Sequence, residues 1–140
     1  MAFAKIDACI VCEGFRPELH NKNLLFGFFG ITPYVRVRLK DVHAPVALCF
    51  VFSGGSPISP GSFNLRLRLI DPTGREVTGP QNSPAISPAS MVAAKGPTNI
   101  FLSFSGVLGS VGTFRVGLIA DQVEQYGTTI EIEQIPKTQA

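Results

Sequence analysis

Hydrophobic and polar residues alternate with a period of two along several short segments of the chain. In 34–40 and in 63–70, Val, Leu or Phe alternates with Arg, Lys or Asn. Successive side chains of a β-strand point to opposite faces, so this pattern predicts strands with one face in a core and the other in water. Four further segments are predicted to be strands for the same reason: 6–13, 99–107, 113–121 and 128–135.

Two apolar runs depart from this alternation. Residues 46–52 are apolar at every position, which predicts a central strand covered on both faces. Residues 24–31 are also apolar, but Gly27 and Gly30 interrupt them, which is typical of a bent or bulged strand.

Turn signals separate these segments. Asp71-Pro72-Thr73-Gly74 matches the preferences of a type I β-turn, so 75–78 should return as the hairpin partner of 63–70. Segments 99–107 and 113–121 are expected to pair with each other across 108–112. Within 79–97, Ser87-Pro88 and Gly96 form a possible start and stop for one short helix, and the alternative is a loop.

About eight short strands without alternating helices predict an all-β fold. The 14 Gly and 11 Pro among 140 residues favour turns over helices. We therefore expect residues 1–140 to form a single domain, a two-sheet antiparallel β-sandwich of the immunoglobulin-like or C2-like type with at most one short helix.

Charge and cysteine content narrow the classes of partner and compartment. A net charge of +2 is too small to predict nucleic-acid binding. Lys5 and Asp7 interrupt the apolar start of the chain, and no segment reaches the length of a membrane span. Three cysteines in a chain of this size favour a reducing compartment, so the expected location is cytoplasmic.

The chain contains three cysteines and two histidines, the residue types most often found in metal and redox sites. Cys9 and Cys12 are spaced as CxxC, but on a strand they point to opposite faces, so we read them, with Cys49, as buried structural residues. His43 follows Asp41 in what we interpret as a solvated turn, and His20 lies in a polar segment. We predict no catalytic residue, no cofactor and no metal site.

Two groups of residues form a possible interaction surface. Arginines on 34–40 and 63–70 would make a basic stripe, shared with Lys40, if those strands are neighbours, and Glu131 and Glu133 could pair with them. The Gly-rich run 24–31 could include an exposed aromatic edge. The residues of this predicted surface are Phe28, Phe29, Arg36, Arg38, Arg66 and Arg68.

Longer stretches carry a family resemblance. The segments ACIVCEGFRPE (8–18) with LFG (25–27), and LRLIDPTG (67–74) with GTFRV (112–116), resemble a family of small, uncharacterised bacterial proteins. The resemblance implies a bacterial, cytoplasmic β-sandwich, and it implies no activity, cofactor or catalytic residue.

The function predicted from the sequence is a non-enzymatic protein-binding or structural module, with a protein partner or a second copy of the chain as its ligand. Two alternatives stay open at this stage. One is a carbohydrate- or lipid-binding β-sandwich module, and the other is a hydrolytic enzyme with a site near His43.

Overall fold

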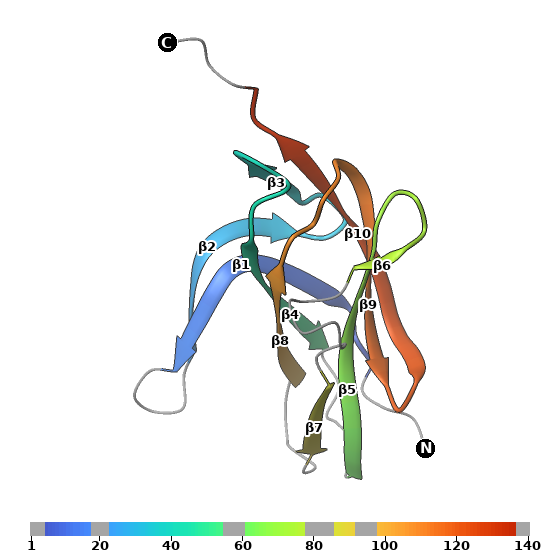
Figure 1. Cartoon of the computed structure of the whole chain (residues 1–140). Coiled ribbons are helices and arrows are strands. Elements are labelled where there is room, and N and C mark those ends of the chain that lie inside the picture. The colour runs from blue at the N-terminus through green and yellow to red at the C-terminus, as the bar shows by residue number, and fades with distance from the viewer. Residues whose placement is uncertain (1–4, 18–22, 55–60, 78–85, 92–97, 137–140) are drawn as a thin grey trace.

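Ten strands form two sheets in the computed structural model of the chain (Figure 1). The structure describes residues 5–17, 23–54, 61–77, 86–91 and 98–136. The four-stranded sheet, in the order β2-β1-β4-β8, contains β1 (Ala8–Pro17), β2 (Asn23–Ile31), β4 (Val46–Gly54) and β8 (Thr98–Gly106). The six-stranded sheet, in the order β3-β10-β9-β5-β6 with β7 also paired to β5, contains β3 (Arg36–Leu39), β5 (Gly61–Ile70), β6 (Glu76–Val77), β7 (Ile86–Met91), β9 (Gly112–Ala120) and β10 (Val123–Gln134).

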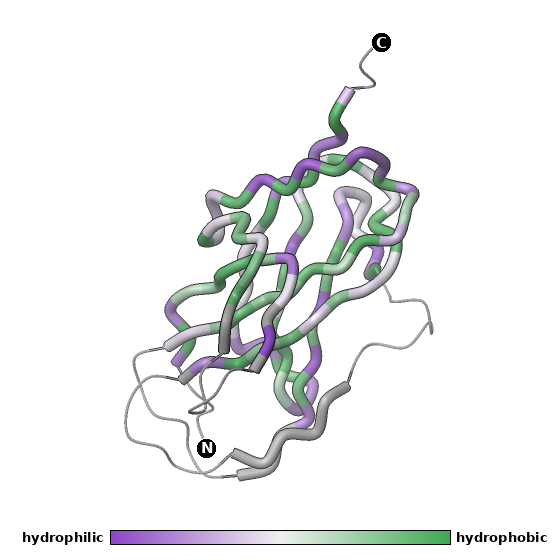
Figure 2. The backbone as a smooth tube through the Cα atoms, turned by 90° about the vertical axis from the view of Figure 1, so that its left-hand side faces the viewer, coloured by the Kyte–Doolittle hydropathy of each residue, from purple (hydrophilic) through white to green (hydrophobic). Residues whose placement is uncertain are grey.

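The core lies between the two sheets and is built from the inward positions of the alternating segments. The largest fully buried side chains include Phe50 and Phe52 of β4, and Phe114 of β9. They belong to one cluster with apolar side chains of β1, β3, β5, β8 and β10. Hydrophobic and hydrophilic residues alternate visibly along the backbone (Figure 2). The prediction of an all-β, two-sheet sandwich is therefore confirmed, with one parallel strand pair, β3 with β10, in an otherwise antiparallel arrangement.

The prediction of a short helix within 79–97 is wrong for the residues of this segment that the structure describes. Residues Ile86–Met91 form β7 and pair antiparallel with β5, Arg66 facing Ile86 and Gly61 facing Met91. Residues 92–97 lie outside the described residues. The helix signals at Ser87-Pro88 are equally compatible with an edge strand, since proline is tolerated there.

The predicted pairing of 99–107 with 113–121 is also wrong. The first segment is β8, which pairs with β4, and the second is β9, which pairs with β5 and β10 in the other sheet. Between them, Leu108 is buried and Gly109 donates its N–H to the Val42 carbonyl at 2.8 Å. The connection thus crosses from one sheet to the other rather than forming a hairpin.

The predictions for the two apolar runs are confirmed. β4 is buried on both faces, with Cys49 and Val51 covered on the side away from the main core. In β2, Gly30 faces Val11 and Phe28 faces Cys12, so Phe29 is an extra residue between them, a β-bulge.

The predicted turn and its hairpin partner are also confirmed. The Gly74 N–H donates to the Asp71 carbonyl at 3.0 Å, and β6 pairs with the end of β5. The Asp71 carboxylate accepts hydrogen bonds from the amides of Thr73 and Arg75 at 2.9 and 3.0 Å. The Thr73 hydroxyl also donates to this carboxylate, at 2.6 Å. The hydroxyl bond first, and the amide bonds after it, hold the pKa of Asp71 below its usual value.

Candidate functional site

The arginines predicted on two strands do not form one stripe. β3, which carries Arg36 and Arg38, is separated from β5, which carries Arg66 and Arg68, by β9 and β10. Alternation placed each arginine on an outward face, but it carries no information on which strands are neighbours. The condition for a continuous basic stripe, that the two strands are neighbours, is therefore not met.

The predicted partners of the β3 arginines are confirmed in part. Arg36 Nη1 lies 3.7 Å and Arg38 Nε lies 3.2 Å from the Glu133 carboxylate on β10. Glu131 instead accepts a hydrogen bond from the Thr113 hydroxyl of β9.

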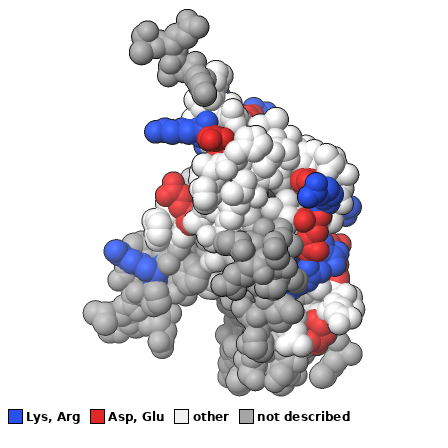
Figure 3. Space-filling view, in the orientation of Figure 1, with Lys and Arg blue, Asp and Glu red and all other residues white. Residues whose placement is uncertain are grey.

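Charged side chains gather over the six-stranded sheet. In Figure 3, blue and red atoms follow the right-hand margin, where Figure 1 places strands of that sheet, and further charged groups lie on the left. Two hollows on this face are lined by residues of β5 and β9 together with the β9–β10 turn in the first and β10 in the second, and Arg68 lines both.

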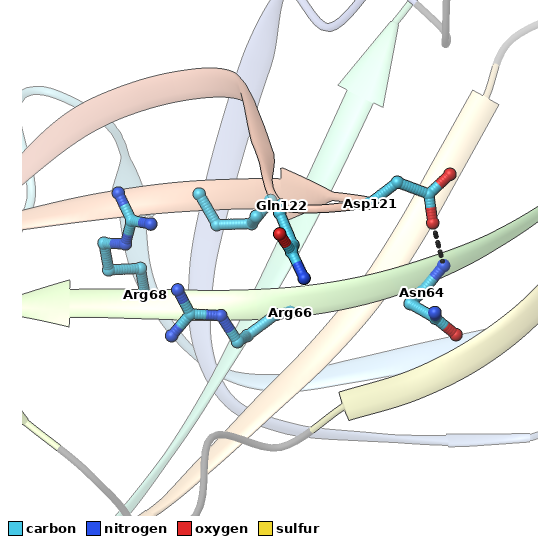
Figure 4. A pocket seen from close by; sticks show the side chains of 6 residues that line it. Asn64, Arg66, Arg68, Asp121 and Gln122 are labelled. Atoms are coloured by element: carbon cyan, nitrogen blue, oxygen red, sulfur yellow. Dashed lines mark hydrogen bonds between the residues drawn. The ribbon is translucent and has the colours of Figure 1, made fainter.

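The first hollow lies beside the β9–β10 turn and has a volume of about 500 Å³ (Figure 4). Asp121 and Gln122 form that turn with φ of 49° and 70°, the left-handed conformation of a tight hairpin turn. Asp121 Oδ1 accepts a hydrogen bond from the Asn64 amide at 2.9 Å, which ties the turn to β5. Arg66 forms an ion pair with Glu76 on β6, so its charge is already compensated.

The second hollow, here called the glycine hollow, has a volume of about 400 Å³. Its floor follows one register row, in which Arg68 of β5 faces Gly117 of β9, and Gly117 faces Gly127 of β10. In the adjacent row, Arg115 faces Thr129. The hollow therefore combines two arginines and a hydroxyl over a floor of two glycines, against which the Glu124 carboxylate lies.

Arg115 was missed as a site residue by the sequence reasoning, although the alternation of 113–121 placed it on an outward face. Arg115 lies near Arg68 because β5 pairs with β9, with Ile70 facing Arg115. That pairing could not be read from either segment alone.

The aromatic run on β2 is divided between the surface and the core. Phe28 is 63% exposed and Phe26 is 48% exposed, whereas Phe29 is half-buried and packs against the main core. Of the two predicted aromatic site residues, the structure places Phe28 at the surface and Phe29 mainly inside.

The three cysteines are buried on two different faces. Cys9 belongs to the main core, whereas Cys12 belongs to a second cluster on the outer side of the four-stranded sheet, so the predicted parity is confirmed. Cys12 faces Cys49 directly across β1 and β4, and the Cys12 thiol donates to the Gly14 carbonyl at 3.3 Å. Sequence reasoning missed this neighbour, because it compared Cys12 only with Cys9. Burial raises the pKa of Cys9 and of Cys49 to about 12.

His43 lies in an exposed turn, as predicted. Its backbone amide donates to Asp41 Oδ1 at 2.9 Å, and the residue lines an open hollow with Ser110 and Glu131. Within the described ranges, no hydrogen bond joins the imidazole to another side chain. His20 lies outside the described residues.

The described residues offer no cluster of metal ligands and no membrane-spanning helix. Among them, no group of three or more His, Cys, Asp or Glu residues is arranged to hold a metal ion. None of the elements described is a helix long and apolar enough to cross a membrane.

Comparisons with known proteins assign the chain to no family. No family model matches the chain, and no curated protein is significantly similar to it. One similar structure is the alkylpurine DNA glycosylase AlkC of Pseudomonas fluorescens bound to DNA with an abasic-site analogue, at 13% identity and a TM-score of 0.41 over 73% of this chain. The chain spans 28% of the length of that glycosylase. Another is an immunoglobulin-like protein of Pseudomonas aeruginosa, at 12% identity and a TM-score of 0.36 over 93% of this chain and 99% of that one.

Proposed function

We propose that the chain is a non-enzymatic protein-binding module, and that it binds through the outer face and free edge of the four-stranded sheet. The observation that carries this proposal is the exposure of large apolar side chains on β2. Phe26, Phe28 and Ile31 are 48%, 63% and 51% exposed on this single strand. Contiguous exposed apolar side chains are typical of interaction sites.

Cross-strand neighbours extend this apolar surface inward from the edge. Ile31 faces Ile10, and Phe28 faces Cys12, so the exposed residues of β2 continue the small buried cluster of Cys12, Cys49 and Val51. A partner seated on β2 would therefore enlarge an existing apolar layer.

The backbone of β2 offers a second means of binding. β2 is the last strand of its sheet in the described part of the chain, and its sequence NLLFGFFGI contains no charged residue and no proline. Exposed edges without such residues readily accept a further strand, with backbone hydrogen bonds giving affinity and side chains giving specificity. A second copy of the chain is the simplest occupant, because two β2 edges could pair antiparallel about a two-fold axis.

The test compares three lysine substitutions by sedimentation velocity over a wide concentration range. Phe28→Lys should keep the fold and lose association, whereas Phe29→Lys should lose folding stability, because its ring packs on the core. Val123→Lys is the matched control, since Val123 is 60% exposed but lies on β10 of the other sheet. It should change neither property.

A parent chain that stays monomeric at every concentration would exclude the second copy as occupant. A protein that is recovered with the parent, shown to bind it when purified, and lost with Phe28→Lys would then support a different partner. If purified partners bind Phe28→Lys and the parent equally, the proposal is wrong.

We also propose a bacterial, cytoplasmic origin and an immunoglobulin-like type of sandwich. The resemblance of 8–18 and 67–74 supports the first, together with three free and buried cysteines. Consecutive strands that change sheet, as β4 to β5 and β8 to β9 do, support the second.

A further inference from the structure

The glycine hollow has features that the proposed protein-binding face does not use. We propose that it binds an oxyanion, either a carboxylate or a phosphate group, between the guanidinium groups of Arg68 and Arg115. The ligand is defined by this chemistry, and the site lies on the opposite sheet from β2.

The floor of the hollow leaves room for a ligand close to the sheet. Gly117 and Gly127 face each other on β9 and β10, so neither contributes a side chain at the point where Arg68 approaches from β5. On ordinary strands this row would be filled by two side chains. Here it forms a hollow of about 400 Å³.

The two arginines lie beside this floor on neighbouring strands. Arg68 faces Gly117 while Ile70 faces Arg115, so Arg68 and Arg115 are diagonal neighbours, with Cα atoms on the order of 7–8 Å apart. Both line the hollow, and Thr129, opposite Arg115, adds a hydroxyl donor. Guanidinium groups bind carboxylate and phosphate oxygens in a bidentate manner, which suits an anion held between two of them.

The charges of these arginines are uncompensated within the described residues. Arg36 and Arg38 pair with Glu133, and Arg66 pairs with Glu76, but no described acidic group lies within ion-pair distance of Arg68 or Arg115. Of the arginines on this face, these two are thus the ones available to an external anion.

Glu124 shows that a carboxylate fits the floor. A Cβ atom placed on Gly117 would lie 2.7 Å from Glu124 Oε1, and one placed on Gly127 would lie 3.4 Å from Oε2. The Glu124 side chain is exposed to solvent. It therefore competes with an incoming anion and lowers its affinity.

The experiment is a titration of the full chain with inorganic phosphate and, separately, with glutarate, at constant ionic strength, followed by two-dimensional amide NMR. Saturable shifts should be centred on Arg115, Gly117 and Gly127, with a Kd on the order of 1 mM. Arg68→Gln and Arg115→Gln should each weaken binding about tenfold, the loss of one charge-assisted contact. Glu124→Gln should strengthen it about fivefold by removing a nearby like charge.

Arg36→Gln is the matched control, because it removes an equal charge from the same sheet outside the hollow, and its affinity should match that of the parent. The relative affinities for phosphate and glutarate identify which oxyanion the site prefers. Equal weakening by Arg36→Gln and Arg68→Gln would show only diffuse attraction and overturn the proposal, as would shifts that do not saturate with either anion. These variants leave β2 unchanged, so the result is independent of the protein-binding proposal.

Discussion

The outer faces of the two sheets differ in how they meet water. On the six-stranded sheet, arginine and glutamate side chains follow β3, β5 and β10, and the short edge strands β3 and β6 both carry charge. On the four-stranded sheet, the strands β2, β4 and β8 contain no Asp, Glu, Lys or Arg, and β1 carries Glu13 and Arg16. Charge on a face or an edge disfavours association, so the six-stranded sheet is the better protected of the two, and the proposed binding face lies on the less charged sheet.

The apolar outer face also has its own small buried cluster. Val51 is 3% exposed and Cys49 is 1% exposed, although both point away from the main core. The corresponding layer of the six-stranded sheet is the glycine floor with its polar surroundings. The four-stranded sheet thus has an apolar cluster on each face, whereas the outer face of the six-stranded sheet combines polar side chains with Ile119, which is 1% exposed, and Ile70.

The largest expected effect comes from placing a charge in this outer cluster. Val51→Asp should lower the free energy of unfolding by about 3–5 kcal/mol, because it buries a carboxylate without a partner. Ala47→Asp is the control, since Ala47 lies on the same face of β4 but is exposed, and it should change stability by less than about 1 kcal/mol. Urea unfolding of both variants gives the comparison. Equal and small effects would mean that the outer cluster is open to water and that the contrast between the faces is wrong.

An intermediate effect is expected from the ionisation of the thiols at alkaline pH. Cys9 and Cys49 have a pKa of about 12 in the folded chain against 9.0 when exposed, because burial disfavours the thiolate. Above pH 9.0 the unfolded chain therefore binds fewer protons than the folded one, and stability falls as pH rises toward 12. The loss is about 1.4 kcal/mol per pH unit for each such thiol.

Alanine variants of these two cysteines test whether water is excluded equally from the main core and from the outer cluster. Cys9→Ala removes the thiol of the main core and Cys49→Ala that of the outer cluster, and each should reduce the slope of stability against pH by the same amount. Urea unfolding from about pH 8 to about pH 11 measures these slopes. A slope unchanged by Cys49→Ala alone would show that the outer cluster is hydrated.

Much of the fold could be predicted from the sequence, because side-chain alternation reports directly on burial. The bulge in 24–31, the doubly covered strand 46–52 and the turn at Asp71 were all visible as local patterns. The sheet assignment of β8 and β9 was not, because pairing depends on contacts between distant segments. β7 was missed because Ser-Pro signals suit both a helix start and an edge strand.

The same limit applied to the candidate site. Outward arginines were predicted one strand at a time, but the glycine hollow exists only because Gly117 and Gly127 face each other beside Arg68. Likewise, Cys12 and Cys49 are separated by 37 positions and meet only through the pairing of β1 with β4. Residue types and their faces could be read from the sequence, whereas their combination across strands could not.

The smallest expected effect tests whether the charges of the six-stranded face contribute to folding. Arg38 Nε lies 3.2 Å from Glu133 Oε2, but the Arg38 side chain is 73% exposed, so the pair is screened by water and salt. Arg38→Ala should therefore cost less than about 1 kcal/mol in the free energy of unfolding at low salt, and the cost should vanish at high salt. A double-mutant cycle with Glu133→Gln isolates the pair itself. A coupling energy that exceeds this range and survives high salt would mean that the charged face is part of the stable structure, and that its charges do more than keep the sheet apart from other proteins.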